Sequence, residues 1–109
     1  AAAFGVTVKV ESALGSPGFN VPKDSASVNL ISKVFSKMGI TPKPEPSGGG
    51  MDANRFNYNG LESVGLATGY FDNHTTNEHV VVEDLIRSGE MVYETVMEYS
   101  ADPASYTVK

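Results

Sequence analysis

The sequence predicts an α/β fold in which helices pack on a mostly parallel sheet. Residues 6–11 alternate valine with polar side chains, a pattern typical of a half-buried strand. Residues 28–38 carry apolar side chains at helical spacing, and so do residues 85–99 near the other end of the chain. Since strand and helix patterns alternate, we expect one α/β layer with parallel pairing and a right-handed crossover.

The first part of the chain begins with the strand of residues 6–11 and a loop of residues 12–22 that is rich in glycine and proline. A helix is expected next, because a side-chain oxygen of Asp24 or Ser25 can accept a free backbone N–H at its start. Gly39 is well placed to end this helix in a left-handed conformation. The stripe expected to face the core consists of Val28, Ile31, Phe35 and Met38, widened by Leu30 and Val34.

The rest of the chain alternates between short elements and loops. Residues 41–46 contain three prolines, which lack the N–H of a sheet ladder, so we expect an extended edge or a polyproline conformation. A short helix over residues 52–58, a buried strand over residues 63–68 and a polar loop over residues 69–77 are expected to follow. The last helix should cover residues 83–99, because acidic residues favour its positive end. Its expected buried face consists of Leu85, Val92, Val96 and Tyr99.

Composition excludes several classes of protein. The 109 residues carry 8 basic and 13 acidic side chains without a basic run that could follow phosphates, so we expect no nucleic-acid partner. The absence of cysteine excludes disulfides, thiolate zinc sites and a cysteine nucleophile, and it suits a cytoplasmic protein. No stretch approaches the ~20 apolar residues that span a bilayer, and the first ten residues lack the features of a signal peptide. We therefore expect a soluble protein with no membrane partner.

A glycine-rich loop at residues 47–50 is the first candidate site. Three successive glycines let the backbone approach a ligand closely, and the N–H groups of the helix that follows would favour a carboxylate or a phosphate. The Lys-Ser/Thr ending of a nucleotide P-loop is missing. The alternative interpretation is a flexible surface turn.

Histidines supply the second candidate site. His74 lies in a polar loop after an apolar strand, where a neutral imidazole could bind zinc. The alternative is a structural or solvent-exposed histidine. His79 precedes a valine run, so we expect a packing or surface role for it. Asp52 and Glu78 are candidate general bases.

Together these motifs resemble the closing segment of peptidase T-like zinc exopeptidases, in the wider family that includes carboxypeptidase G and aminoacylase. Members of that family share a glycine-rich loop followed by Asp-Ala, a short helix, a strand ending in glycine, and His-Thr/Ser with a glutamate four residues on. The matching residues here are Gly48-Gly49-Gly50, Asp52-Ala53, Gly69, His74-Thr75 and Glu78. The resemblance covers about residues 23–99.

The resemblance implies a metallopeptidase that hydrolyses small peptides with two zinc ions. It implies that His74 binds one zinc ion. The substrate-binding wall would consist of Gly48, Gly49, Gly50, Asp52 and Asn54. The other metal ligands and the catalytic glutamate of such enzymes precede this segment, so we expect no catalytic residue in this segment and no activity from the chain alone.

The resemblance also implies a division of the chain. Residues 1–22 would be the end of a lid or dimerisation domain with its linker, and residues 23–109 would be the C-terminal part of the catalytic domain. Tripeptides, dipeptides and acylated amino acids are all substrates consistent with the sequence, and a homodimer is one way to cover exposed strands. The alternative hypothesis is a non-catalytic anion-binding or interaction module that reuses the same fold.

Overall fold

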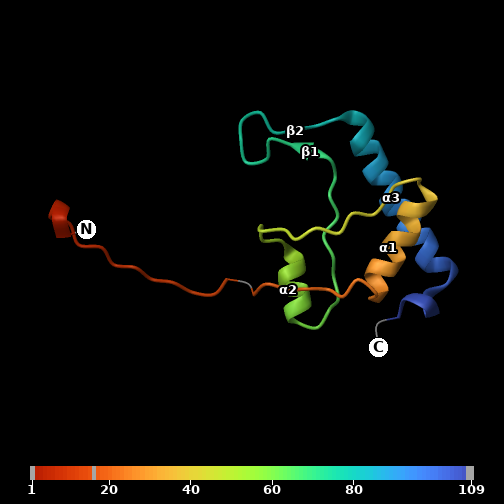
Figure 1. Ribbon diagram of the computed structural model, residues 1–109, viewed down its shortest axis with the longest axis horizontal. Coiled ribbons are helices and arrows are strands. Elements are labelled where there is room, and N and C mark those ends of the chain that lie inside the picture. Colours follow the sequence, from red (N-terminus) through yellow and green to blue (C-terminus); the bar gives the residue numbers. More distant parts are fainter. Residues whose placement is uncertain (1, 16, 108–109) are drawn as a thin grey trace.

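The computed structural model describes residues 2–15 and 17–107 and is mostly helical (Figure 1). Among these residues, three α-helices, α1 (Ala26–Lys37), α2 (Asp52–Tyr58) and α3 (Val82–Ala101), are joined by irregular segments. Strands β1 (Tyr70–Phe71) and β2 (His79–Val80) form an antiparallel hairpin. Short 3-10 turns, η1 (Ala2–Phe4) and η2 (Pro103–Tyr106), lie near the two ends of the chain. The predicted short helix over residues 52–58 is confirmed to the residue.

The mostly parallel sheet does not form in the part of the chain that the structure describes. Residues 6–11 and 63–68, which the sequence predicts as strands, run without a strand partner there, and the valines of the first segment are exposed. A helix completes its backbone hydrogen bonds internally, whereas a strand needs a neighbour to accept and donate them. The sheet prediction is therefore wrong for the described residues, and both segments keep open hydrogen-bonding edges.

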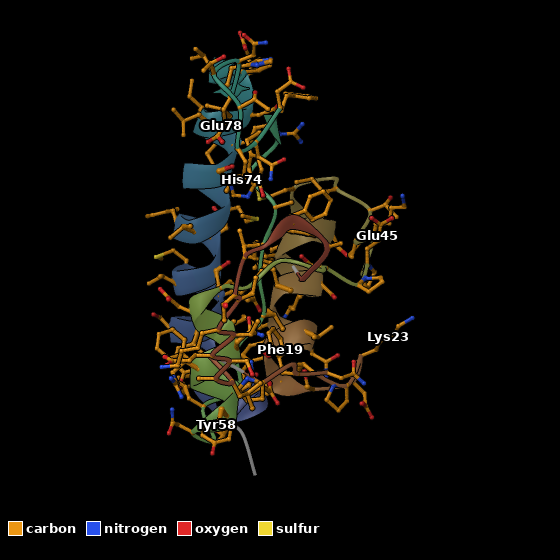
Figure 2. The ribbon with its side chains drawn as sticks, turned by 90° about the vertical axis from the view of Figure 1, so that its left-hand side faces the viewer. Phe19, Lys23, Glu45, Tyr58, His74 and Glu78 are labelled. Carbon is orange, nitrogen blue, oxygen red and sulfur yellow. The ribbon has the colours of Figure 1, made fainter. Side chains whose placement is uncertain are left out.

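The molecule is elongated. Its radius of gyration is 18.9 Å, whereas a compact domain of this length has a radius of about 13 Å. It exposes 8649 Å² of surface, compared with about 5,800 Å² for a compact monomer of its mass. Figure 1 shows the N-terminal segment leading away from the helices. Figure 2 shows Tyr58, at the end of α2, far from Glu78 on the hairpin loop.

Helix α1 begins and ends where the sequence predicts. The Ser25 side chain accepts the N–H of Val28 at 3.4 Å, and Gly39 ends the helix with a left-handed φ of 69°. Ile31 and Val34 are buried, and Val34 has no exposed surface. The apolar stripe of this helix therefore faces the core as expected.

A carboxylate from a later loop completes the start of α1. Glu62 accepts the backbone N–H of Ser27 at 2.8 Å and its hydroxyl at 2.6 Å. These hydrogen bonds to Ser27 lower the pKa of Glu62 below its usual value. The segment after α2 is thus attached to α1 by the free N–H groups that every helix start presents.

Helix α3 packs on α1 with a different face from the predicted one. The helix itself is confirmed within two residues at each end, but its buried side chains are Met91 and Glu98. The predicted stripe of Leu85, Val92, Val96 and Tyr99 is 45–59% exposed. An apolar stripe indicates that this side of a helix packs against other apolar residues, but α1 contacts a different side of α3. The prediction of the buried face is therefore wrong for this chain. None of the helices in the described ranges is long and apolar enough to span a membrane.

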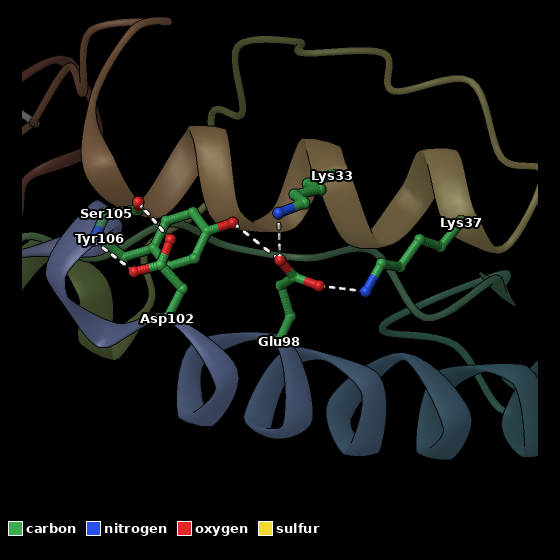
Figure 3. Close-up of polar contacts among 6 residues, drawn as sticks. All are labelled: Lys33, Lys37, Glu98, Asp102, Ser105 and Tyr106. Carbon is green, nitrogen blue, oxygen red and sulfur yellow. Dashed lines mark hydrogen bonds and ion pairs between the residues drawn. The ribbon is translucent and has the colours of Figure 1, made fainter.

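A small core and a polar cluster hold α1, α3 and η2 together. The core consists of Ile31, Val34 and Met91, with Phe35 and Met38 packed against it. Next to it lies the carboxylate of Glu98, which is 5% exposed (Figure 3). Lys33 approaches one of its oxygens to 2.5 Å, Lys37 pairs with the other, and Tyr106 donates a hydrogen bond of 3.0 Å.

These partners make the burial of Glu98 tolerable, because a buried charge is costly unless it is paired and hydrogen-bonded. The hydrogen bonds from Lys33 and Lys37 are the main reason that the pKa of Glu98 falls to about 2. Glu98 in turn raises the pKa of Lys33. The two lysines come from α1 and Tyr106 from η2, so one carboxylate joins three elements.

Candidate metal and substrate site

His74 lies in the loop that joins β1 to β2. Its backbone has a φ of 66°, and Asp72 nearby has a φ of 52°, so two non-glycine residues of this loop adopt the left-handed conformation. The His74 N–H donates to the Glu78 carboxylate at 2.7 Å. The imidazole is exposed, and no residue in the described ranges hydrogen-bonds to it. The backbone is therefore restrained, while the ring is available to a ligand.

His79 lies on β2 directly opposite Phe71 of β1. Its ring stacks on the phenyl ring of Phe71 with centroids 5.4 Å apart, and its Nδ1 lies 2.8 Å from the carbonyl oxygen of Asn77. This stacked ring agrees with the packing role predicted for His79. Metal-bound imidazoles, however, are also commonly oriented by a carbonyl at the second nitrogen. The carbonyl contact of His79 is thus compatible with either role, and substitution of each histidine tests the assignment.

The described residues provide at most part of a metal site. In residues 2–15 and 17–107, no group of three or more histidine, aspartate or glutamate side chains lies close enough to hold a metal ion. A catalytic zinc ion normally takes three protein ligands and leaves a fourth position open. The exposed imidazole of His74 fits as one such ligand. The others would have to come from outside these residues.

The glycine-rich loop has open space around it. A side chain added at Gly48 or Gly50 would meet no other atom within 4 Å, and at Gly49 only the Ser47 hydroxyl at 3.7 Å. None of these three glycines has a left-handed φ. Nothing in the described chain therefore requires glycine here, which leaves close approach of another molecule as a physical reason for it.

Asp52 and Asn54, the other predicted substrate-binding residues, differ in their surroundings. Asp52 is exposed in the first turn of α2. Asn54 instead accepts the Met51 N–H at 2.9 Å and donates to the Pro17 carbonyl at 3.0 Å. The Asn54 side chain already accepts the Met51 N–H, and the Asp52 carboxylate lies in the first turn. The start of this short helix is therefore poorly suited to bind an anion. Only Asp52 of the pair has a side chain open to a substrate.

The extended segment between α2 and β1 connects the two motifs. A side chain at Gly65 would lie 2.6 Å from the Met51 sulfur, so this segment passes directly beside the end of the glycine loop. Gly69 has a φ of 75°, and a side chain there would lie 3.1 Å from the Asp84 side chain at the start of α3. The left-handed φ and the Asp84 contact explain glycine at residue 69, whereas the flexible end of the Met51 side chain could move aside for a side chain at residue 65. No hydrogen bond or ion pair in the described ranges joins the His74 loop directly to the glycine loop.

Glu98 and Asn57 are structural residues that sequence reasoning missed. The Asn57 amide bonds to the Ala53 carbonyl and to both backbone groups of Ser63, which closes the turn after α2. Glu98 had one signal in the sequence, because Lys33 and Lys37 are four residues apart and share a helix face. Nothing in the sequence tells which acidic residue they meet.

Comparison with known proteins assigns the family. The profile of the peptidase family M20/M25/M40 matches residues 5–98, which contain both candidate motifs. The chain belongs to this family. A relative, the uncharacterized protein YqjE of Bacillus subtilis (strain 168), is 36% identical over 98 residues, which is 90% of this chain. Peptidase T of the same organism is 27% identical over 74 residues.

A solved structure supports the assignment to the peptidase T-like branch of the M20 family. Aminopeptidase PepT from Bacillus cereus ATCC 10987 superposes with a TM-score of 0.74 at 38% sequence identity and covers 78% of this chain. The predicted resemblance is thereby confirmed. The chain spans only 26% of YqjE, 18% of the Bacillus subtilis peptidase T and 23% of the PepT chain. The described residues thus form part of an M20 peptidase domain.

Proposed function

We propose that this chain supplies the C-terminal part of the catalytic domain of a zinc-dependent exopeptidase that hydrolyses small peptides. The observation that carries the proposal is the family match over residues 5–98, because this range includes both the glycine loop and the histidine loop. Relatives named peptidase T and aminopeptidase PepT support small peptides as the substrate class. Tripeptides, dipeptides and acylated amino acids are the candidates to compare.

His74 is the proposed metal ligand, and the glycine loop with Asp52 is the proposed substrate wall. The exposed ring of His74 and the open space over Gly48 and Gly50 support these roles. Bound zinc would supply Lewis-acid polarisation of the substrate carbonyl. The residues of this chain would place one imidazole on the metal and leave room for the substrate backbone. Asn54 acts within this proposal by fixing the loop rather than by contacting substrate.

The missing parallel sheet is proposed to form with chain beyond these residues. Residues 1–22 would belong to the lid domain and its linker, and residues 23–109 to the catalytic domain. The outward stripe of α3 and the unpaired segment 63–68 are then the surfaces that pack against the rest of the catalytic domain. The three-quarters of each relative that this chain does not span is large enough to provide those partners.

The chain alone is expected to be inactive, because a single imidazole cannot hold a catalytic zinc ion. The measurement is zinc-dependent cleavage of di- and tripeptides by the purified 109-residue chain, with His74→Ala as the control. Cleavage above that control would contradict this part of the proposal.

The proposed ligand is tested in the protein that carries this chain together with the upstream part found in its relatives. His74→Ala should lower the zinc content by about one ion and reduce turnover more than ~100-fold, beyond the usual effect of residues that only orient a ligand. His79→Ala should change both by less than about tenfold, because its ring stacks on Phe71. Equal losses from both substitutions, or full zinc content in His74→Ala, would place the ligand elsewhere.

A further inference from the structure

We propose that Glu78 is a positioning residue for His74: its carboxylate holds the His74 backbone in the left-handed conformation and so sets the direction of the imidazole. The inference rests on the proposed role of His74 as a metal ligand. Glu78 is four residues further along the same loop, and Figure 2 shows both residues there. Their contact is between the Glu78 carboxylate and the His74 backbone, not the ring.

The conformation of His74 needs an explanation. Left-handed backbone costs a residue with a side chain about 1–2 kcal/mol relative to the right-handed form, and this loop contains two such residues, Asp72 and His74. Intrinsic preference alone does not account for these two conformations, since histidine and aspartate adopt left-handed backbone only in a minority of cases. Such conformations persist when surrounding contacts determine them, and they concentrate at functional sites.

The contacts that determine this conformation converge on Glu78 and Thr75. Glu78 accepts the His74 N–H at 2.7 Å through a charged oxygen, the stronger kind of hydrogen bond. Thr75 donates its hydroxyl to the Asp72 carbonyl at 2.7 Å and accepts the Asn77 N–H at 3.1 Å. The Glu78 N–H returns to the Thr75 carbonyl at 3.3 Å. The two side chains thereby brace both left-handed residues from within the loop.

The direction of the imidazole follows from the backbone. In the described ranges no hydrogen bond orients the His74 ring, whereas His79 has one ring contact to Phe71 and another to Asn77. The backbone conformation at residue 74 therefore decides where its Cα–Cβ bond points. If Glu78 no longer holds the N–H, the loop can relax toward the right-handed conformation, and the ring would move away from the metal.

The first experiment is nuclear magnetic resonance of the 109-residue chain as wild type, Glu78→Ala, Glu78→Gln and, as a control of equal charge change, Glu90→Ala. Glu90 is exposed on α3 and makes no side-chain hydrogen bond in the described ranges. Glu78→Ala should remove the left-handed backbone signature of His74 and speed exchange of its amide about 3–10-fold. Glu78→Gln keeps an acceptor oxygen and should retain much of the signature. An unchanged His74 signature in Glu78→Ala would overturn the inference.

The second experiment measures zinc dissociation from the longer protein. Glu78→Ala should weaken zinc binding about 10–100-fold, with partial recovery in Glu78→Gln and no change in Glu90→Ala. Glu78→Ala could lose the His74 backbone signature and keep its zinc affinity while His74→Ala still loses zinc. That result would refute the positioning role of Glu78 and leave the proposed function standing. If His74→Ala itself leaves zinc affinity unchanged, the proposed function fails. The backbone experiment then still decides whether Glu78 holds the loop.

Discussion

Helices α1 and α3 pack as a pair within this chain, whereas two extended segments, one before and one after α2, form no sheet in the described residues. The helices pack on each other, bury Val34 completely and satisfy the Glu98 carboxylate of α3 with partners from α1 and η2. The extended segments 6–11 and 63–68 have no strand partner in the described chain. Helical hydrogen bonds are local and strand hydrogen bonds are not, so a helix can form with one neighbour while a strand waits for its sheet.

The two faces of α3 repeat this difference within one element. The inward face contains a methionine and a paired glutamate, whereas the outward face carries the wider apolar stripe. A stripe of that kind on a soluble protein marks a contact surface. The structure thus separates interactions that this chain completes by itself from those that it offers to another partner.

The largest effect should come from a substitution in the core between α1 and α3. Val34→Ala removes two methyl groups from a fully buried site and should lower the free energy of unfolding by about 2 kcal/mol. Val92→Ala, the same change on the outward face of α3, should cost less than about 0.5 kcal/mol. Urea unfolding of the 109-residue chain, followed by helical circular dichroism, measures both. Similar losses from the two variants would show that the outward stripe is already buried in solution.

The Glu98 cluster should make the contact between α1 and α3 sensitive to acid. The folded-state pKa of Glu98 is about 2, below its ordinary value of 4.5. Because the folded form binds this proton less readily than the unfolded form, the stabilisation is present above pH 4.5 and disappears as the pH falls toward 2. Thermal unfolding between pH 6 and pH 2 should therefore show a falling midpoint.

A matched variant isolates the contribution of Glu98. Glu98→Gln should be less stable near pH 6, because it removes the charge that pairs with Lys33 and Lys37. It should also show a shallower decline with acid, since the remaining slope comes from other carboxylates such as Glu62, whose pKa is also lowered. Equal slopes in the two proteins would show that the cluster does not form in solution.

The smallest of these effects should separate two kinds of glycine. Gly69→Ala forces a side chain into a left-handed conformation and toward Asp84, at a cost of about 1–2 kcal/mol to the hairpin. Gly48→Ala meets open space without a left-handed φ, so it should be neutral or stabilise by less than about 1 kcal/mol. Amide exchange across β1 and β2 measures the difference. A cost at Gly48 equal to that at Gly69 would mean that the loop is already packed against something.

Much of the local structure could be predicted from the sequence. The start of α1 at Ser25, its left-handed end at Gly39 and the bounds of α2 follow from capping chemistry and glycine, which act within a few residues. The family could also be predicted, because the glycine loop, Asp52-Ala53 and His74-Thr75 with Glu78 occur at a joint spacing. The roles of the individual site residues stay predictions.

Tertiary structure alone decided the buried face of α3, the fate of the predicted strands and the partners of Glu98. Each depends on which element lies beside it in the folded chain. The periodicity of apolar residues indicates only that some packing partner is required. The valines of segment 6–11 and the stripe around Val92 have the right pattern for burial, but the described chain offers no surface to cover them. The sequence by itself determined where helices begin and end, because those interactions are local. Pairing and burial join residues distant in the chain, so only the folded arrangement could decide them.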